Sequence, residues 1–285
     1  MRGGRGLGNN TMDYKILVLD IDGTITNSKK EITKATHDAI IRVQEAGVKV
    51  VIASGRPTFG VAPVADALEL AKYGGMILSF NGGMITDWRT RDIIFEKPLP
   101  NDRIDDVIAI AAQYQVALLT YRNGTVLTES PNDPYVQLEG RTNKMPVESV
   151  FDLTQTIDFP VVKFMMVGDG NYLAEIEPSV RRALGGKFSV YRSEPYFLEI
   201  VAAGIDKAKS LAILLEKLGM TKEQMVCCGD GFNDLSMIRY AGLGVAMKNG
   251  SGEVKDAADY VAPSNDEDGV AAVIDKFFLK GTGRE

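Results

Sequence analysis

The first third of the chain alternates short apolar, β-branched runs with segments of helical periodicity. Continuous apolar runs bounded by turn residues predict strands that are buried on both faces. Strands that alternate with helices through short loops predict a parallel sheet with helices on both sides. The strands expected here are 14–21, 48–53 and 76–80, and the helices are 33–45 and 58–71.

The pattern changes after Asn81-Gly82-Gly83, where alternation over 84–97 predicts a hairpin, and hairpins and helices then mix as far as residue 200. After residue 205 the alternation of helices and strands returns. We therefore predict a doubly wound, Rossmann-like α/β core (13–83 and 201–285) with an inserted α+β cap domain (84–200). Residues 1–12 are rich in Gly, Arg and Asn, which predicts a flexible extension.

The remaining predicted elements follow in chain order. They are helix 101–114, strands 116–121, 125–129 and 161–167, helix 171–184, strands 187–192 and 196–201, helix 205–218, strand 225–228, helix 233–240, strand 243–246, helix 252–258, strand 259–261 and helix 268–279.

Composition narrows the class of protein. Hydrophobic residues make up 45% and charged residues 25% of the chain, which predicts a large buried core. The net charge of −6 argues against a nucleic-acid partner. No apolar run reaches the roughly 18 residues of a membrane-spanning helix. The adjacent Cys227 and Cys228 fall in a predicted buried strand, which favours reduced core residues and a cytoplasmic protein.

Two aspartates, Asp20 and Asp22, come at the end of the first predicted strand. Their side chains can converge on one cation only if the chain leaves strand geometry near Asp22, and Gly23 permits such a turn. A site of this kind can bind Mg²⁺ and leave one carboxylate as a nucleophile. The alternative interpretation is a capping aspartate followed by a turn aspartate.

Three further segments carry candidate chemistry. Ser54-Gly55-Arg56-Pro57 ends the second strand and can cradle a phosphate, although a helix N-cap by Ser54 is the simpler interpretation. Asn81 ends the third strand and either donates to a ligand or fills a turn. Lys207 begins a helix, where a lysine is favoured if an anion lies nearby.

A fourth segment, Gly229 to Asp234, places Asp230, Asn233 and Asp234 on a glycine-rich loop that enters a helix, which suits a hard divalent cation. All of these segments lie at the carboxyl ends of predicted parallel strands or at the starts of the following helices. Open α/β sheets bind their ligands at that edge.

Taken together, Asp20-Ile21-Asp22-Gly23-Thr24, Ser54-Gly55-Arg56-Pro57, Asp206-Lys207 and Gly229-Asp230-Gly231-Phe232-Asn233-Asp234 resemble the four motifs of the haloacid dehalogenase superfamily. The long insertion after Asn81-Gly82-Gly83 resembles the Cof-type (type IIB) branch of sugar-phosphate phosphatases. The likeness extends from Tyr14 to about Phe278.

The resemblance implies a Mg²⁺-dependent phosphatase that acts on small phosphorylated metabolites, with sugar phosphates expected. It implies that Asp20 is the nucleophile that forms an aspartyl-phosphate and that Asp22 is the general acid and base. The roles implied for the other residues are Mg²⁺ binding by Asp20, the Asp22 carbonyl, Asp230 and Asp234, phosphate binding by Ser54, Gly55, Lys207 and Asn233, and a place in the pocket for Arg56 and Asn81.

Two alternatives remain open at this point. A hexose phosphomutase would share the first half-reaction, and a non-catalytic sugar-phosphate sensor would share the binding site. The inserted domain would act as a lid. Its candidates for substrate contact are Arg122, Asn123, Arg141, Lys144 and Lys163, although a solvated surface charge is the favoured interpretation of each.

Overall fold

The computed structural model describes residues 13–279, which divide into two compact units. Residues 13–50 and 215–279 form the first unit, and residues 51–214 form the second. The boundaries between the units fall inside one strand and one helix. The extension predicted over residues 1–12 lies outside the described residues.

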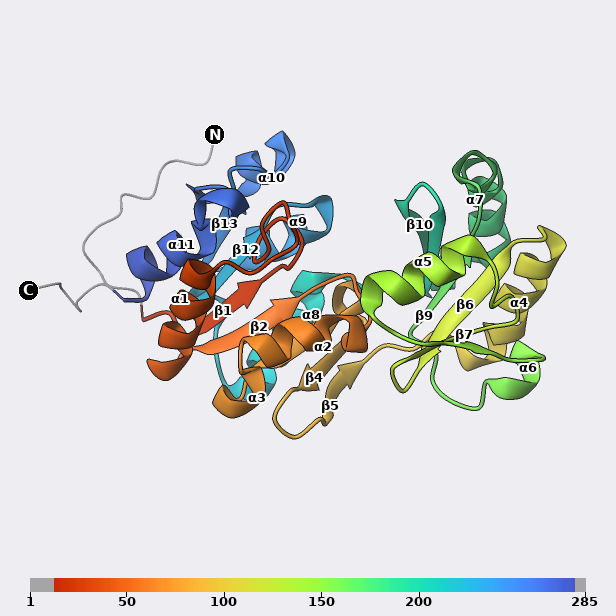
Figure 1. Cartoon of the computed structure of the whole chain (residues 1–285), viewed down its shortest axis with the longest axis horizontal. Helices are drawn as coiled ribbons and strands as arrows, with labels where there is room; N and C mark the ends of the chain where they lie inside the picture. Colours follow the sequence, from red (N-terminus) through yellow and green to blue (C-terminus); the bar gives the residue numbers. More distant parts are fainter. Residues whose placement is uncertain (1–12, 280–285) are drawn as a thin grey trace, which may run out of the picture. The chain divides into compact units, whose positions relative to one another are not determined.

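The first unit is built on parallel strands. Its elements are β1 (Ile16–Leu19), α1 (Lys34–Glu45), η4 (Lys222–Gln224), β12 (Met225–Gly229), η5 (Phe232–Asp234), α9 (Leu235–Tyr240), β13 (Leu243–Met247), α10 (Gly252–Ala257), β14 (Tyr260–Ala262), η6 (Asn265–Glu267) and α11 (Gly269–Phe277). The strands run in the order β14-β13-β12-β1. Helices α1 and α11 lie side by side, while α9 and α10 pack against β13 (Figure 1).

Particular residues account for the start of α1 and for the common edge of β1 and β12 in the first unit. Thr33 caps α1, because its hydroxyl accepts a hydrogen bond from the amide of Thr36. β1 pairs with β12 so that Leu19 lies opposite Cys228, and both strands therefore end at the same edge. Cys227 and Cys228 are buried and unbridged, as predicted.

The second unit contains the other elements, except for the start of β2 and the end of α8, which belong to the first unit. They are β2 (Lys49–Ala53), α2 (Thr58–Ala67), α3 (Leu70–Tyr73), β3 (Met76–Ser79), η1 (Phe80–Gly82), β4 (Met84–Asp87), β5 (Ile93–Glu96), η2 (Asn101–Arg103), α4 (Ile104–Gln113), β6 (Ala117–Arg122), β7 (Thr125–Thr128), α5 (Pro134–Asn143), β8 (Val147–Ser149), α6 (Leu153–Thr156), β9 (Lys163–Val167), α7 (Gly170–Leu184), η3 (Gly185–Lys187), β10 (Phe188–Glu194), β11 (Phe197–Ala202) and α8 (Lys207–Leu218).

Strands in the second unit form two groups. β2 and β3 are parallel, and the predicted hairpin of β4 and β5 continues the sheet from β3 in antiparallel fashion. A separate six-stranded sheet has the order β10-β11-β9-β6-β7-β8 and buries one large apolar cluster with α4 and α7. The α/β class with a parallel core is confirmed. The limits of the inserted domain at residues 84 and 200 stay a prediction.

The prediction of one helix is wrong, and helix α5 was not predicted. The helix expected over 58–71 is two helices, because Glu69 adopts a left-handed conformation with φ of 53° between α2 and α3. Helix α5 is absent from the elements predicted above. It begins after Asp133, whose side chain accepts from the amides of Tyr135 and Val136, and it has a proline in its first turn.

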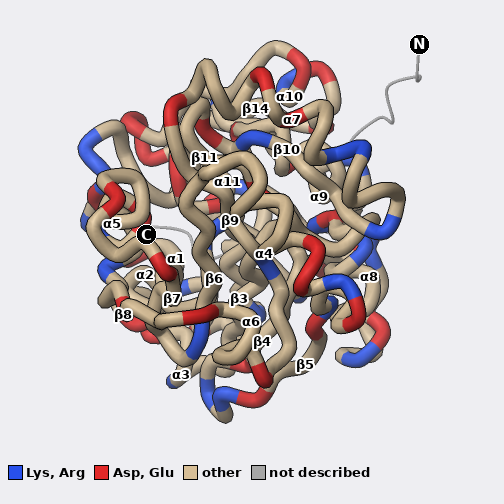
Figure 2. Tube along the Cα trace, turned by 90° about the vertical axis from the view of Figure 1, so that its right-hand side faces the viewer, with Lys and Arg blue, Asp and Glu red and all other residues tan. Residues whose placement is uncertain are grey.

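Charges of both signs are interspersed along the described trace, as Figure 2 shows. Among residues 13–279, none of the helices has the length and apolar character needed to span a bilayer.

Candidate active site

The first unit gathers three carboxylates at the edge where β1 and β12 end. Asp20, Asp230 and Asp234 each offer one oxygen, and these oxygens all lie within 4.8 Å of one another. Asp20 is 7% exposed and Asp234 is fully buried. The amide of Asp20 donates to the Cys228 carbonyl over 3.1 Å, so the pairing of the two strands continues into the site.

Hydrogen bonds fix the loop after β12. One oxygen of Asp234, Oδ2, accepts from the amides of Asp230 and Gly231 over 3.0 and 2.9 Å. The Thr24 hydroxyl donates to Oδ1 of Asp230 over 2.8 Å. These bonds hold the carboxylates in place and leave an oxygen-rich donor set. Such a set fits a hard divalent cation such as Mg²⁺.

Gly23 allows this approach of the two loops. It has φ of +81°, and a Cβ added to it would overlap Oδ2 of Asp230. The left-handed conformation and the close contact both require glycine. The turn that the sequence predicts after Asp22 is therefore present, and its reason is the packing of Asp230 against the Gly23 backbone.

We expect Gly23→Ala to disrupt the acidic cluster. The added methyl would displace Asp230, so that the variant loses activity and stability. Gly47→Ala is the matched control, because Gly47 has φ of +89° but no atom within 4 Å of the place that an added methyl would take. The control should cost about 1 kcal/mol for backbone strain alone, and Gly23→Ala about 1–3 kcal/mol more. Urea unfolding measures both, and equal losses would contradict the argument.

Asp22 does not join the three clustered carboxylates. Its side chain is 37% exposed and forms an ion pair with Lys30 over 3.0 Å. Asp22 also forms an isolated bridge with Thr26, which shapes the turn after β1. Asn233, the other predicted residue of the loop, is exposed. The contacts of Lys30 with Asp22 and of Thr24 with Asp230 were not predicted from the sequence, although Thr24 belongs to the Asp-x-Asp-Gly-Thr motif itself.

The second unit brings together the other predicted site residues after β2 and β3. Ser54 is buried, and its hydroxyl accepts from the amide of Arg56 over 3.2 Å. The backbone amide of Asn81 donates to the Ser54 carbonyl over 3.0 Å. Lys207, only 1% exposed, donates to the Ala53 carbonyl over 2.9 Å. Burial of this lysine at the end of β2 departs from the surface position that is usual for the residue type.

The six-stranded sheet contains a buried ion pair that sequence analysis did not find. Lys163 and Glu199 are 2% and 5% exposed, and their charged atoms are 3.3 Å apart. The solvated position favoured for Lys163 is therefore wrong. The Tyr191 hydroxyl donates to the second oxygen of Glu199 over 3.1 Å, and Tyr121 donates to buried Glu139 over 2.7 Å.

Burial and the neighbouring Glu199 carboxylate raise the pKa of Tyr191 above its usual value. A raised pKa in the folded state gives a contribution to stability that is complete below the unfolded-state pKa of about 10 and is lost as the pH rises above it. Above pH 10 we expect the unfolding free energy of the wild type to fall more steeply than that of Tyr191→Phe, by about 1.4 kcal/mol for each pH unit. Urea unfolding measures the slope between pH 8 and about pH 11, which is about one unit above the pKa of an unfolded tyrosine. Parallel slopes in the two proteins would contradict this result.

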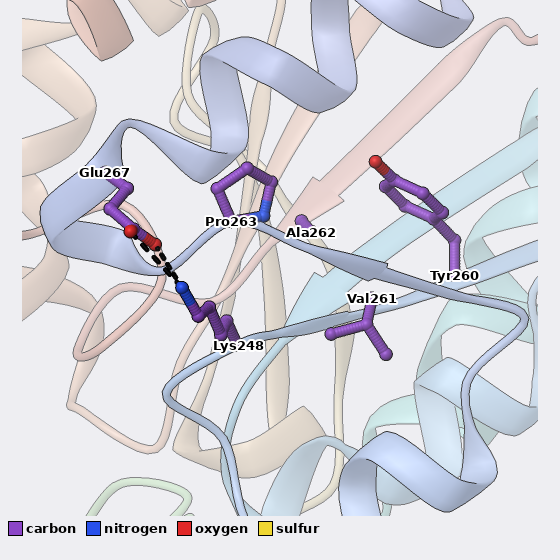
Figure 3. Close-up of a pocket in the computed structure, with 6 residues that line it drawn as sticks. All are labelled: Lys248, Tyr260, Val261, Ala262, Pro263 and Glu267. Atoms are coloured by element: carbon purple, nitrogen blue, oxygen red, sulfur yellow. Dashed lines mark hydrogen bonds and ion pairs between the residues drawn. The ribbon is translucent and has the colours of Figure 1, made fainter.

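A hollow in the first unit is lined by none of the three clustered carboxylates. It is lined by Lys248, Tyr260, Val261, Ala262, Pro263 and Glu267. Figure 3 shows Lys248 and Glu267 reaching toward each other across it, with 3.3 Å between their charged atoms. Hydrogen bonds from Ser264, and then Lys248, lower the pKa of Glu267. None of the predicted site residues lines this hollow, so we assign these contacts to the stability of the turn after β14.

Comparison with known proteins supports the resemblance. The family model of haloacid dehalogenase-like hydrolases matches residues 17–274. A haloacid dehalogenase-like hydrolase from Bacteroides thetaiotaomicron has 48% identity and a TM-score of 0.90, over 93% of this chain and 100% of that chain. A subclass IIB sugar phosphatase structure has 25% identity and a TM-score of 0.75, over 92% and 98% of the two chains.

A curated relative gives the same result. The 5-amino-6-(5-phospho-D-ribitylamino)uracil phosphatase of Bacillus subtilis is 31% identical to this chain, over 94% of this chain and 97% of its own length. The predictions of the superfamily, of its Cof-type branch and of a phosphatase are confirmed. The chain belongs to the family of haloacid dehalogenase-like hydrolases.

Proposed function

We propose that the chain is a Mg²⁺-dependent phosphatase that hydrolyses small phosphorylated metabolites, sugar phosphates in particular, through an aspartyl-phosphate. The observation that carries this proposal is the convergence of Asp20, Asp230 and Asp234 within 4.8 Å. Three carboxylates held this close repel one another unless a cation lies among them. The two adjacent buried thiols support a cytoplasmic location.

In the proposed reaction, Asp20 attacks phosphorus and Asp22 protonates the leaving oxygen. Asp22 then takes a proton from the water that hydrolyses the aspartyl-phosphate. Bound Mg²⁺, held by Asp20, the Asp22 carbonyl, Asp230 and Asp234, would supply charge neutralisation between the carboxylate and the phosphate. The partly exposed side chain of Asp22 supports its role, because an acid and base must reach both the leaving group and water.

We assign phosphate binding to Ser54, Gly55, Lys207 and Asn233, and a place beside the leaving group to Arg56 and Asn81. The support for Lys207 is its place at the end of β2, where its buried ammonium donates to the Ala53 carbonyl one residue before Ser54 and would attract a phosphate oxygen. The buried Ser54 hydroxyl and the turn amides after it offer the kind of polar cradle that binds phosphate oxygens.

Two relatives support the substrate class. One is named for a phosphorylated ribityl compound and another is a sugar phosphatase, so both act on small phosphorylated molecules that carry hydroxyl groups. The acidic net charge agrees with a small substrate rather than a nucleic acid.

The test is release of inorganic phosphate from a broad panel of phosphate esters, with Mg²⁺ and with a chelator. We expect Mg²⁺-dependent release, fastest with sugar or polyol phosphates. Isomerised hexose phosphate without release of phosphate would replace this proposal with a phosphomutase. Binding of sugar phosphates without any turnover would indicate a sensor.

A further inference from the structure

The turn after β3 holds an unusual run of backbone conformations. Phe80, Asn81 and Gly82 have φ of 52°, 55° and 103° in succession. Left-handed conformations are uncommon for residues with a side chain and cost energy, so they persist only where the surroundings enforce them. Here the amides of Phe80 and Asn81 donate to the carbonyls of Arg56 and Ser54, both over 3.0 Å. The strained turn is thereby tied to the proposed phosphate cradle.

The carboxamide of Asn81 lies directly against that cradle. A Cβ built on Gly55 would be 3.0 Å from Nδ2 and 3.1 Å from Oδ1 of Asn81. The orientation of this amide therefore decides which of its two polar atoms a bound substrate would meet. An amide that is free to rotate would present a donor or an acceptor equally well.

A line of hydrogen bonds sets the orientation. Tyr191 and Glu199 lie opposite each other on β10 and β11, and the Tyr191 hydroxyl donates to Oε2 of Glu199 over 3.1 Å. A carboxylate only accepts, so it takes the single proton of the phenol. The phenol oxygen can then only accept, and Nδ2 of Asn81 donates to it over 3.3 Å.

Lys163 forms an ion pair with Glu199 at the far end of this line. Its ammonium is 3.3 Å from Oε1 of Glu199 and lies 5.7 Å from the centre of the Phe80 ring. Burying an ion pair gains little stability over apolar side chains of similar size, so stability is a weak reason for this pair. Fixing the polarity of a hydrogen-bonded line is a role that apolar residues could not fill.

We propose that Tyr191, held by Glu199 and Lys163, is a positioning residue that orients the Asn81 carboxamide beside Ser54 and Gly55 and so selects substrates whose leaving group carries hydroxyl groups. This inference rests on the proposed function. It adds Tyr191, Glu199 and Lys163 to the residues that determine specificity. Hydroxyl groups beside the phosphate ester would hydrogen bond with the fixed amide, whereas a leaving group without hydroxyls would gain nothing from it.

The first test compares Tyr191→Phe with the wild type on two substrates. One is the sugar or polyol phosphate that the wild type hydrolyses fastest, and the other is p-nitrophenyl phosphate, which lacks hydroxyl groups on its leaving group. We expect kcat/KM to fall about fivefold on the first, mainly through KM, and to stay unchanged on the second. Tyr172→Phe is the matched control, because Tyr172 donates to the Tyr114 carbonyl elsewhere in the unit, and it should alter neither.

The second test asks whether Tyr191 acts through Asn81. In an Asn81→Ala background, Tyr191→Phe should change kcat/KM on the hydroxylated substrate by less than about 1.5-fold, because the group that it orients is absent. Equal losses on both substrates, or a full effect of Tyr191→Phe without Asn81, would overturn the inference. Absence of any phosphate release by the wild type would instead overturn the proposed function.

Discussion

Asp20→Asn should abolish release of phosphate while the protein stays folded. The amide has nearly the same size as the carboxylate but is not a nucleophile towards phosphorus, so we expect kcat to fall by about 10⁴-fold or more. Asp230 accepts from the Thr24 hydroxyl and Asp234 accepts from two amides of its own loop, so neither carboxylate can take the place of Asp20 without a shift of that loop. A phosphate-release assay measures the loss.

The same variant should be more stable than the wild type when divalent cations are chelated. Two carboxylates within 4.8 Å repel by about 3.5 kcal/mol or more at an effective dielectric constant of 20, and the substitution removes one charge from the group. We expect Tm to rise, by about 2–4 °C for each kcal/mol of repulsion that is removed.

Asp13→Asn is the control for Asp20→Asn, because Asp13 precedes the same strand and is highly exposed beside Lys15. It should change neither activity nor Tm. Retention of phosphate release by Asp20→Asn would contradict the role of Asp20, and a lower Tm in chelator would contradict the repulsion within the cluster.

The position of the acidic cluster could be expected from the sequence because of one physical rule. Apolar runs identify β1 and β12, and parallel strands end at a common edge, so the residues after them meet there. The structure does gather Asp20 with Asp230 and Asp234. What the sequence could not show is that Asp22 turns away to Lys30, because that pair depends on the path of the loop after Gly23.

Other features depend on neighbours that are distant in the chain. Lys163 interrupts an apolar run, and its partner Glu199 is reached only through the antiparallel pairing of β9 with β11. Helix α5 has a clear start at Asp133-Pro134, but its polar composition hides the periodicity on which the sequence analysis relied. The break at Glu69 leaves no proline or glycine signal, since it is a left-handed glutamate.

Mg²⁺ should stabilise the wild type but not Asp230→Asn. A ligand that binds only the folded protein adds about 2.7 kcal/mol at a concentration of 100 times Kd. That gain corresponds to a rise in Tm of several degrees for a chain of this size. Asparagine retains a side-chain oxygen that can accept from Thr24, whose hydroxyl is 2.8 Å from Oδ1 of Asp230, but it removes a charged ligand from the cluster. Thermal unfolding with added MgCl₂ and with a chelator measures the difference.

The stability of Asp230→Asn in chelator, compared with that of the wild type, distinguishes a cation site from a carboxylate that only holds the loop. If Asp230 serves a cation, Asp230→Asn loses the Mg²⁺ effect and gains stability in chelator, because repulsion with Asp20 and Asp234 falls. If the Asp230 carboxylate is needed only for the Thr24 hydrogen bond, asparagine can replace it, so the variant gains no stability in chelator and Mg²⁺ stabilises it as it does the wild type. Asp275→Asn is the control, since Asp275 is exposed and paired with Arg42, and it should retain the full response to Mg²⁺.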